Sequence, residues 1–311
     1  MKQILLLLIF LFGLPNINRA AEVQKADTIP FEIGPDKRIY VKVYLNGCKD
    51  KSYRFLIDTG ASGVVLNASL PEVMALARFT KHVVNQGPTS IEEIPATSNN
   101  QSIQVGHSEV KGLSLIAIPY PPEAWDGVLG LSFLSCFDMI LNYDRKEMYL
   151  YACGTAPRPN VQSVDFVYKA NVPIIPIVVT IKEKQHHLMV ELDSGSDRVL
   201  DINTPYVNEH QLRGTLPVFA ISSISGTSAA QGNLENVCFD IAEIGFTKFP
   251  LLPGAFSTLT SGLQATKEFD GVIGNNLLQR FNQQWDFVNN KLYLTVNHRY
   301  YTPFYDFLIV R

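Results

Sequence analysis

The sequence predicts an all-β protein made of two similar lobes related by internal pseudo-twofold symmetry. One apolar strand leads into Asp58-Thr59-Gly60, and another leads into Asp193-Ser194-Gly195, 135 positions later (193 − 58 = 135). A second match aligns the segment from Asp126 with the segment from Asp270 at one offset (270 − 126 = 144), without a gap over about 26 positions. The 18 prolines and 20 glycines separate short apolar runs, a pattern typical of β-rich proteins.

Length and composition favour a globular protein of two domains. The chain has 311 residues, of which 46% are hydrophobic, and this is enough for two ordinary cores. The formal net charge is −3, and the lysines and arginines are scattered along the chain. Nucleic-acid binding is therefore not expected, because it requires a concentrated basic surface.

The N-terminus is predicted to be a signal peptide covering residues 1–21. Lys2 supplies a positive charge, the segment from Ile4 to Leu14 is almost wholly apolar, and small residues follow at Ala20 and Ala21. An apolar run of this length is short for a membrane span. We therefore expect export to the periplasm or the extracellular space, without stable membrane insertion once the signal is removed; a retained signal anchor is the alternative.

The four cysteines leave the disulfide pattern open. Two disulfides are possible in an exported chain, but four cysteines allow three connectivities, and free thiols are an equal alternative. No CxxC pair is present, and the histidines include only one adjacent pair, His186-His187. We predict neither a metal site nor a cofactor.

In chain order, the first half reads as a series of short strands. Strands are expected at 39–45 and 53–57, a short helix at 71–77, and a polar loop or hairpin at 86–102. Further strands are expected at 110–118, at 126–131 and at 139–151. A linker that contains Gly, Pro, Thr and Asn lies between Ala152 and Val161, so we place the N-terminal lobe at 22–153 and the C-terminal lobe at 154–311.

The second half repeats this order. Strands at 174–181 and 188–192 lead to Asp193, a polar segment covers 221–232, and the segment from Asp270 matches that from Asp126. Asp126 and Asp270 stand beside glycines and are expected to act as turn residues. Asp197 and Asp201 are expected to be surface charges, with contacts to polar substrate groups as the alternative.

Two such aspartates suggest a specific chemistry. If the lobes pack about a twofold axis, Asp58 and Asp193 meet there, and carboxylates about 3 Å apart share a proton rather than both ionising. One can then act as general base on a water while the other protonates the carbonyl oxygen of an amide. Support for this dyad is expected from the hydroxyl residues and glycines of the two turns, Thr59, Gly60, Ser194, Gly195 and Ser196. Close packing of the turns is expected from two further glycines, Gly130 and Gly274.

At these positions the sequence resembles the aspartic proteases, both pepsin-like and retropepsin-like. The resemblance rests on Asp58-Thr59-Gly60-Ala61-Ser62 and Asp193-Ser194-Gly195-Ser196-Asp197, followed by Val128-Leu129-Gly130 and Val272-Ile273-Gly274. It implies a bilobal acid-protease-type β-barrel fold in one chain, with two small lobes. It also implies an aspartic endopeptidase, monomeric and acting on peptide or protein substrates.

Two features depart from the pepsin-like pattern. Ala61 replaces a hydroxyl residue, whereas Ser196 is present in the second half, so we expect Asp193 to be the more acidic partner and Asp58 to carry the shared proton. No flap tyrosine stands in a recognisable motif, and composition places the flaps at about 96–110 and 221–233.

Two other functions are compatible with parts of this pattern. One is a catalytically inactive homologue of the same fold that binds peptides or inhibits proteases. The other is an exported β-sandwich protein that binds carbohydrates or surfaces, in which the repeats are structural. The latter would have no reason to keep acid, hydroxyl residue and glycine together twice.

Overall fold

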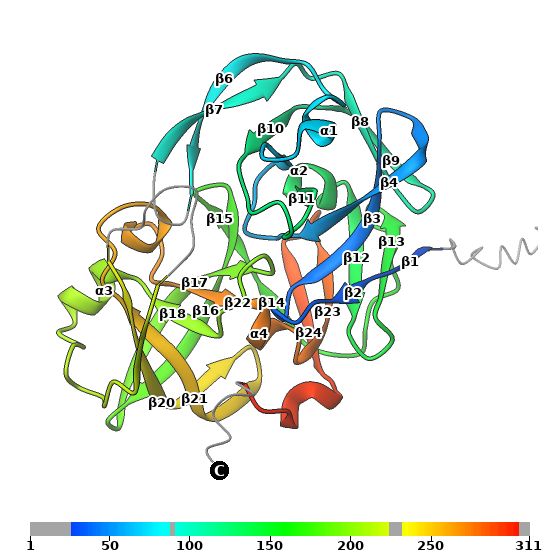
Figure 1. The fold of residues 1–311 in the computed structure, drawn as a ribbon. Helices are drawn as coiled ribbons and strands as arrows, with labels where there is room; N and C mark the ends of the chain where they lie inside the picture. The colour runs from blue at the N-terminus through cyan, green and yellow to red at the C-terminus, as the bar shows by residue number, and fades with distance from the viewer. Residues whose placement is uncertain (1–25, 88–90, 224–231, 305–311) are drawn as a thin grey trace, which may run out of the picture.

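The computed structural model describes residues 26–87, 91–223 and 232–304. The predicted signal peptide at 1–21 therefore lies outside the described residues. Among these residues, no helix is long and apolar enough to cross a membrane. Three β-sheets dominate the chain, and Figure 1 shows them as two lobes with a shared sheet alongside. The prediction of an all-β, two-lobed protein is confirmed.

The first lobe is built on a sheet of ten strands in the order β6-β7-β10-β5-β11-β4-β3-β8-β9, with β2 paired to β3. Its strands are β2 (Glu32–Ile33), β3 (Ile39–Leu45), β4 (Cys48–Ile57), β5 (Val64–Asn67), β6 (Phe79–Gln86), β7 (Ile91–Thr97), β8 (Gln101–Val105), β9 (Ser108–Leu113), β10 (Leu115–Ile118) and β11 (Gly127–Leu129). Two short helices accompany the sheet, α1 (Pro71–Met74) and α2 (Leu131–Leu134).

The second lobe is built on a sheet of eight strands in the order β15-β16-β17-β22-β18-β21-β20-β19, and a β16–β20 pairing closes it into a barrel. Its strands are β15 (Val167–Lys169), β16 (Val172–Ile181), β17 (Lys184–Asp193), β18 (Leu200–Ile202), β19 (Ala220–Ser222), β20 (Leu234–Ile244), β21 (Thr247–Ser257) and β22 (Gly271–Gly274). Its helices are α3 (Thr204–Glu209), α4 (Asn275–Leu278) and the 3-10 helices η1 (Leu263–Ala265) and η2 (His298–Tyr301).

The third sheet joins the two halves of the chain. Its order is β1-β13-β12-β23-β24-β14, with β1 (Asp27–Pro30), β12 (Phe137–Asn142), β13 (Glu147–Ala152), β14 (Ser163–Asp165), β23 (Phe281–Asp286) and β24 (Lys291–Val296). At its centre Ile140 pairs with Gln284, which is its own counterpart in the sequence repeat (284 − 140 = 144). The pseudo-twofold axis therefore passes through the middle of this sheet.

Alternation of buried and exposed residues along the strands explains the core. One apolar cluster runs through both lobes and the shared sheet, and includes Phe55, Met139, Leu192 and Trp285, each with no exposed surface. Successive residues of a strand point to opposite faces of its sheet, so the residues before and after each of these four point away from this cluster. This shared core holds the two lobes in one fixed relation.

Several predicted elements differ in detail from the observed ones. The segment 110–118 is two strands, β9 and β10, separated at Ser114, whose hydroxyl donates to the Thr97 carbonyl oxygen at 2.9 Å. The segment 139–151 is a hairpin of β12 and β13, because Asn142 Oδ1 accepts the Arg145 N–H at 3.0 Å and starts a turn. The linker between Ala152 and Val161 contains no strand or helix, and the lobe boundary at residue 153 remains a prediction.

The flap prediction for the first lobe is wrong in position. The segment 96–110 mostly forms β8 and part of the edge strand β9, whereas the hairpin that reaches toward the second lobe is β6–β7, drawn in cyan at the top of Figure 1. Beyond β6, the Gly87 carbonyl oxygen accepts the N–H of Leu263 in η1 at 3.0 Å. For the second expected flap, residues 224–231 lie outside the described residues, while 220–222 form β19.

Candidate active site

Asp58 and Asp193 occupy equivalent positions at the ends of the equivalent strands β4 and β17. In each lobe the strand runs parallel to a short partner, with Val128 opposite Leu56 and Val272 opposite Glu191. The apolar strand residues are buried in the sheets, and the chain turns where each strand ends. The sequence pattern of an apolar run followed by Asp, a hydroxyl residue and Gly therefore corresponds to a buried strand that delivers a carboxyl group to a turn.

The two turns meet across the lobes, and each aspartate abuts the glycine of the other turn. A Cβ atom built on Gly195 would lie 2.4 Å from Asp58 Cγ, and one built on Gly60 would lie 2.7 Å from Asp193 Cγ. Real Cβ atoms do not approach other atoms this closely, so any larger side chain would displace the carboxyl groups. The absence of a side chain at both positions allows the two carboxyl groups to come together.

Thr59 and Ser194 tie the turns to each other through four buried hydrogen bonds. Thr59 Oγ1 donates to the Leu192 carbonyl oxygen at 2.6 Å and accepts the Ser194 N–H at 3.1 Å. Ser194 Oγ donates to the Ile57 carbonyl oxygen at 2.9 Å and accepts the Thr59 N–H at 3.0 Å. Each hydroxyl thus serves as donor and acceptor to the opposite lobe, which fixes the turns without using the carboxylates.

Gly130 and Gly274 lie behind the turns, where the chain passes too closely for a side chain. A Cβ on Gly130 would lie 2.1 Å from the Gly63 carbonyl oxygen, and one on Gly274 would lie 2.3 Å from the Arg198 carbonyl oxygen. The helix that follows each glycine donates N–H groups to its turn, as in the 2.8 Å bond from Leu131 to the Ala61 carbonyl oxygen. The second motif of each half therefore supports the first.

Burial is the main cause of the titration behaviour of the pair. It raises the pKa of Asp58, although a hydrogen bond with Asp193 and the Gly60 N–H, 2.8 Å from Asp58 Oδ1, partly oppose it. It raises the pKa of Asp193 further, because the negative charges of Asp58 and Glu191 add to the desolvation. Both carboxyl groups are thus harder to ionise than free aspartates, and the causes of the shifts favour Asp193 as the protonated partner.

The causes of these shifts differ from those behind the expectation that Asp58 carries the proton, which stays a prediction. Backbone N–H groups of Gly60 and Ala61 stabilise the Asp58 carboxylate in place of a side-chain hydroxyl. The Ser196 hydroxyl instead accepts the Arg198 N–H at 3.2 Å. Such backbone donors are not visible in a sequence, so the side chains at 61 and 196 describe only part of the surroundings of the pair.

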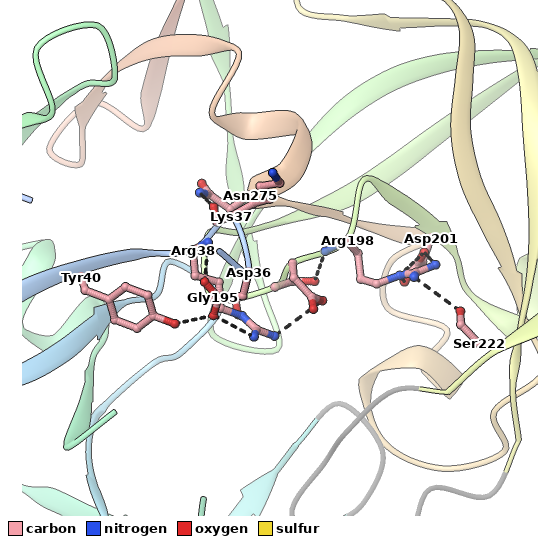
Figure 2. A network of polar contacts seen from close by, with 11 residues as sticks. Asp36, Lys37, Arg38, Tyr40, Gly195, Arg198, Asp201, Ser222 and Asn275 are labelled. Atoms are coloured by element: carbon pink, nitrogen blue, oxygen red, sulfur yellow. Dashed lines mark hydrogen bonds and ion pairs between the residues drawn. The ribbon is translucent and has the colours of Figure 1, made fainter. Parts of the chain in front are cut away.

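Arg38 is a cation beside the dyad that the sequence analysis did not single out. Its Nε donates to the Gly195 carbonyl oxygen at 2.5 Å, and its other nitrogens pair with Asp36 at 3.3 Å and with Asp197 at 3.6 Å (Figure 2). Desolvation would lower the pKa of Arg38, but the charges of Asp197 and Asp36 outweigh it. The Asp197 carboxylate, half exposed, thus helps hold a cation next to the turn that carries Asp193.

Glu191 and Tyr120 are two more residues at the site that received no role from the sequence. Glu191 is 2% exposed, and burial together with the charge of Asp58 raises its pKa to about 8. Burial also raises the pKa of the Tyr120 hydroxyl, and the charge of Asp58 adds to this effect. A charged residue inside the apolar run that precedes Asp193 was the signal available for Glu191. The segment around Tyr120 gave none.

An apolar cluster lies on the first-lobe side of the dyad. It contains buried Tyr40, Leu56, Val65, Ile94, Ile118 and Val128, with Tyr120, Trp125, Ala61, Ile116 and Val83 packed against them. The rings of Tyr120 and Trp125 are 5.0 Å apart. Because Val83 and Ile94 belong to the β6–β7 hairpin, this hairpin contributes directly to the surroundings of the site.

The other aspartates have structural positions. Asp126 Oδ2 accepts the Arg54 N–H of β4 at 2.7 Å, and Asp270 Oδ2 accepts the Met189 N–H of β17 at 2.8 Å, so each carboxylate bonds to a neighbouring strand far along the chain. Asp201 is not the surface charge we expected, because it is fully buried and pairs with Arg198 at 3.1 Å (Figure 2). A buried guanidinium–carboxylate pair of this kind cannot be inferred from the local sequence.

Comparison with known proteins gives one family and one fold. Residues 41–136 match the family described as "gag-polyprotein putative aspartyl protease". The structure is similar to the crystal structure of an aspartic proteinase from Irpex lacteus, with a TM-score of 0.57 and 12% sequence identity over 89% of this chain and 99% of that one. No curated protein sequence matches the chain. The first lobe is therefore similar to an aspartyl protease family, and the chain as a whole shares the two-lobed fold of an aspartic proteinase.

Proposed function

We propose that this protein is an exported aspartic endopeptidase that hydrolyses peptide bonds with a water molecule activated by Asp58 and Asp193. The observation that carries the proposal is the reciprocal approach of the two turns, in which each aspartate abuts the glycine of the other lobe. A structural pair of turn aspartates would not need two buried carboxyl groups in mutual contact, since burying such groups is costly.

The titration behaviour assigns a role to each aspartate. Asp58, the ionised partner, is the general base that removes a proton from a water held between the two groups. Asp193, the protonated partner, donates to the carbonyl oxygen of the scissile amide. The water attacks the carbonyl carbon, and collapse of the resulting diol releases the amine after it takes up a proton, so no covalent enzyme intermediate is needed.

Export and substrate type follow from the sequence and the superfamily. The apolar N-terminal segment at residues 1–21 has the features of a signal peptide, so we place the mature enzyme in the periplasm or outside the cell as a monomer. Its substrates are peptides or proteins. A substrate that lies extended between the lobes would present one amide to the dyad.

The test is cleavage of a mixed peptide library between about pH 3 and about pH 8 by the mature protein and by Asp58→Asn and Asp193→Asn variants. We expect both variants to lose at least about 1000-fold in kcat/KM, because each lacks one member of a unit that acts together. The matched control is Asp165→Asn, which removes an exposed carboxylate paired with Lys291 and should leave cleavage unchanged.

Two outcomes would contradict the proposal. Cleavage that persists in either dyad variant would show that another group carries the reaction. A folded wild-type protein that cleaves nothing across this pH range would instead favour the alternative of a peptide-binding or inhibitory homologue.

A further inference from the structure

The two lobes place unlike residues at equivalent positions beside the dyad. Leu56 stands two residues before Asp58, between Tyr40 and Val128 on the neighbouring strands. Glu191 stands two residues before Asp193, between Ile174 and Val272. The pseudo-twofold axis therefore relates an apolar side chain in one lobe to a carboxyl group in the other.

The Glu191 carboxyl group reaches the turn that carries Asp58. A Cβ atom on Gly60 would lie 2.9 Å from Glu191 Oε1 and the same distance from Asp193 Oδ1. The charge of Asp58 acts on Glu191, and the charge of Glu191 acts on Asp193. Glu191 is thus a third acid at the reaction centre, contributed by the second lobe alone.

Glu191 has no partner for its charge among the described residues. No hydrogen bond or ion pair from these residues reaches its carboxyl group, although the side chain is almost fully buried. Two arginines close to the turn that carries Asp193 have acidic partners of their own, Arg38 with Asp36 and Asp197, and Arg198 with Asp201. A buried carboxyl group without a donor is unfavourable unless it stays protonated or gains a cation from a ligand.

The equivalent position in the first lobe carries no carboxyl group. Leu56 lies with Tyr40, Val65 and Val128 in the apolar cluster beside Tyr120. In an extended peptide, successive side chains point to opposite sides. The two side chains that flank the scissile bond would thus meet different surroundings, apolar toward Leu56 and acidic toward Glu191.

We propose that Glu191 is a specificity-determining residue that selects substrates with a lysine or arginine side chain next to the scissile bond. The cation would pair with the Glu191 carboxylate and supply the charge that the protein itself does not. The inference rests on the proposed endopeptidase function, and it names the class of substrate for the same site.

The experiment compares matched peptides that differ in one residue, with lysine, arginine or uncharged norleucine at each flanking position in turn. We expect wild-type kcat/KM to favour the basic side chains at one position by roughly 10-fold to 100-fold over norleucine. Glu191→Leu gives position 191 the residue type of the equivalent position 56, and in this variant the ratio should fall to about one or below. In Glu191→Gln the ratio should fall to an intermediate value. The control Glu243→Gln removes a half-exposed carboxylate on β20 and should keep the wild-type ratio.

A lysine preference that survives in Glu191→Leu would overturn the proposal, as would a wild type that shows no preference. If the wild type cleaves no peptide, the proposed function fails. The specificity is then measured separately, as the calorimetric affinity for the same peptides with a ketomethylene group in place of the scissile amide. Tighter binding of the lysine peptide by the wild type but not by Glu191→Leu would support the role of Glu191. Equal affinities for lysine and norleucine would reject it.

Discussion

At the scale of single residues, the contact between the two turns depends on the lack of a side chain at two positions. Gly60 and Gly195 lie against the opposing aspartates, whereas Gly63, three residues after Gly60, has no atom within 4 Å of a Cβ built on it. The same residue type therefore has different importance at neighbouring positions of one turn.

Substitution of Gly195 by alanine should abolish activity through this contact. The added methyl group would lie 2.4 Å from Asp58 Cγ, so either the carboxyl group or the turn must move. We expect kcat/KM on a cleaved peptide to fall by more than about 100-fold, since small displacements of reacting groups are costly. Gly63→Ala is the control and should retain activity; equal losses in both variants would argue against the contact as the cause. Circular dichroism and thermal unfolding would show whether Gly195→Ala remains folded.

Thr59 links the lobes at the same scale. Its hydroxyl is fully buried and serves both the Leu192 carbonyl oxygen and the Ser194 N–H. Thr59→Val keeps the shape but leaves these two backbone groups without a partner, so the free energy of unfolding should fall by about 1–3 kcal/mol. Urea unfolding measures the change. Thr80→Val, which removes an exposed hydroxyl bonded only to Ser98 within the described contacts, should have little effect.

At the scale of elements, the ends of β12 and β13 bring two cysteines together. The antiparallel register ends with Phe137 opposite Ala152, so Cys136 and Cys153 are the next residues across the strands. Cys153 Sγ lies 3.2 Å from the Cys136 carbonyl oxygen, and both thiols are exposed in the structure. Cys48 and Cys238 belong to the sheets of different lobes.

We expect Cys136 and Cys153 to form a disulfide in an oxidising compartment, in which a disulfide oxidant takes up the two electrons and two protons of the thiols. Peptide mapping of the exported protein without reduction should link the two peptides, while Cys48 and Cys238 remain open to alkylation. A link between any other pair, or four alkylated thiols, would contradict this connectivity.

At the scale of the whole molecule, the acids buried between the lobes make stability depend on pH. Burial raises the pKa of Glu191 from 4.5 to about 8, and that of Asp193 well above its usual value. The folded protein then binds more protons than the unfolded chain at pH values between the two pKa values of each group. By linkage, the free energy of unfolding is highest below the unfolded pKa values and falls as pH rises toward about 8.

Urea unfolding across this range should show the slope. In Glu191→Gln the neutral side chain has no proton to release, so stability should fall less steeply between about pH 5 and about pH 8. Asp58 and Asp193 titrate at the same centre and keep part of the dependence, whereas Arg38 stays charged and Tyr120 stays neutral throughout this range. A slope that is unchanged in Glu191→Gln would show that Glu191 does not contribute to the dependence.

The sequence by itself determined the repeated unit, the all-β class and the pairing of Asp58 with Asp193. These features are written locally, because strands alternate, turns need particular residues, and a duplicated motif repeats both signals at one offset. The positions of Gly130 and Gly274 followed from the same repeat, since both halves use one packing solution.

Only the tertiary structure decided what surrounds the dyad. Arg38, Tyr120 and Glu191 come from separate segments, and their importance arises when the two lobes pack and water is excluded from between them. The same exclusion explains why Asp201 pairs with Arg198 and why the pKa of Asp193 is raised well above its usual value. Burial and the charge of neighbouring groups set these properties, and both depend on contacts between residues far apart in the chain.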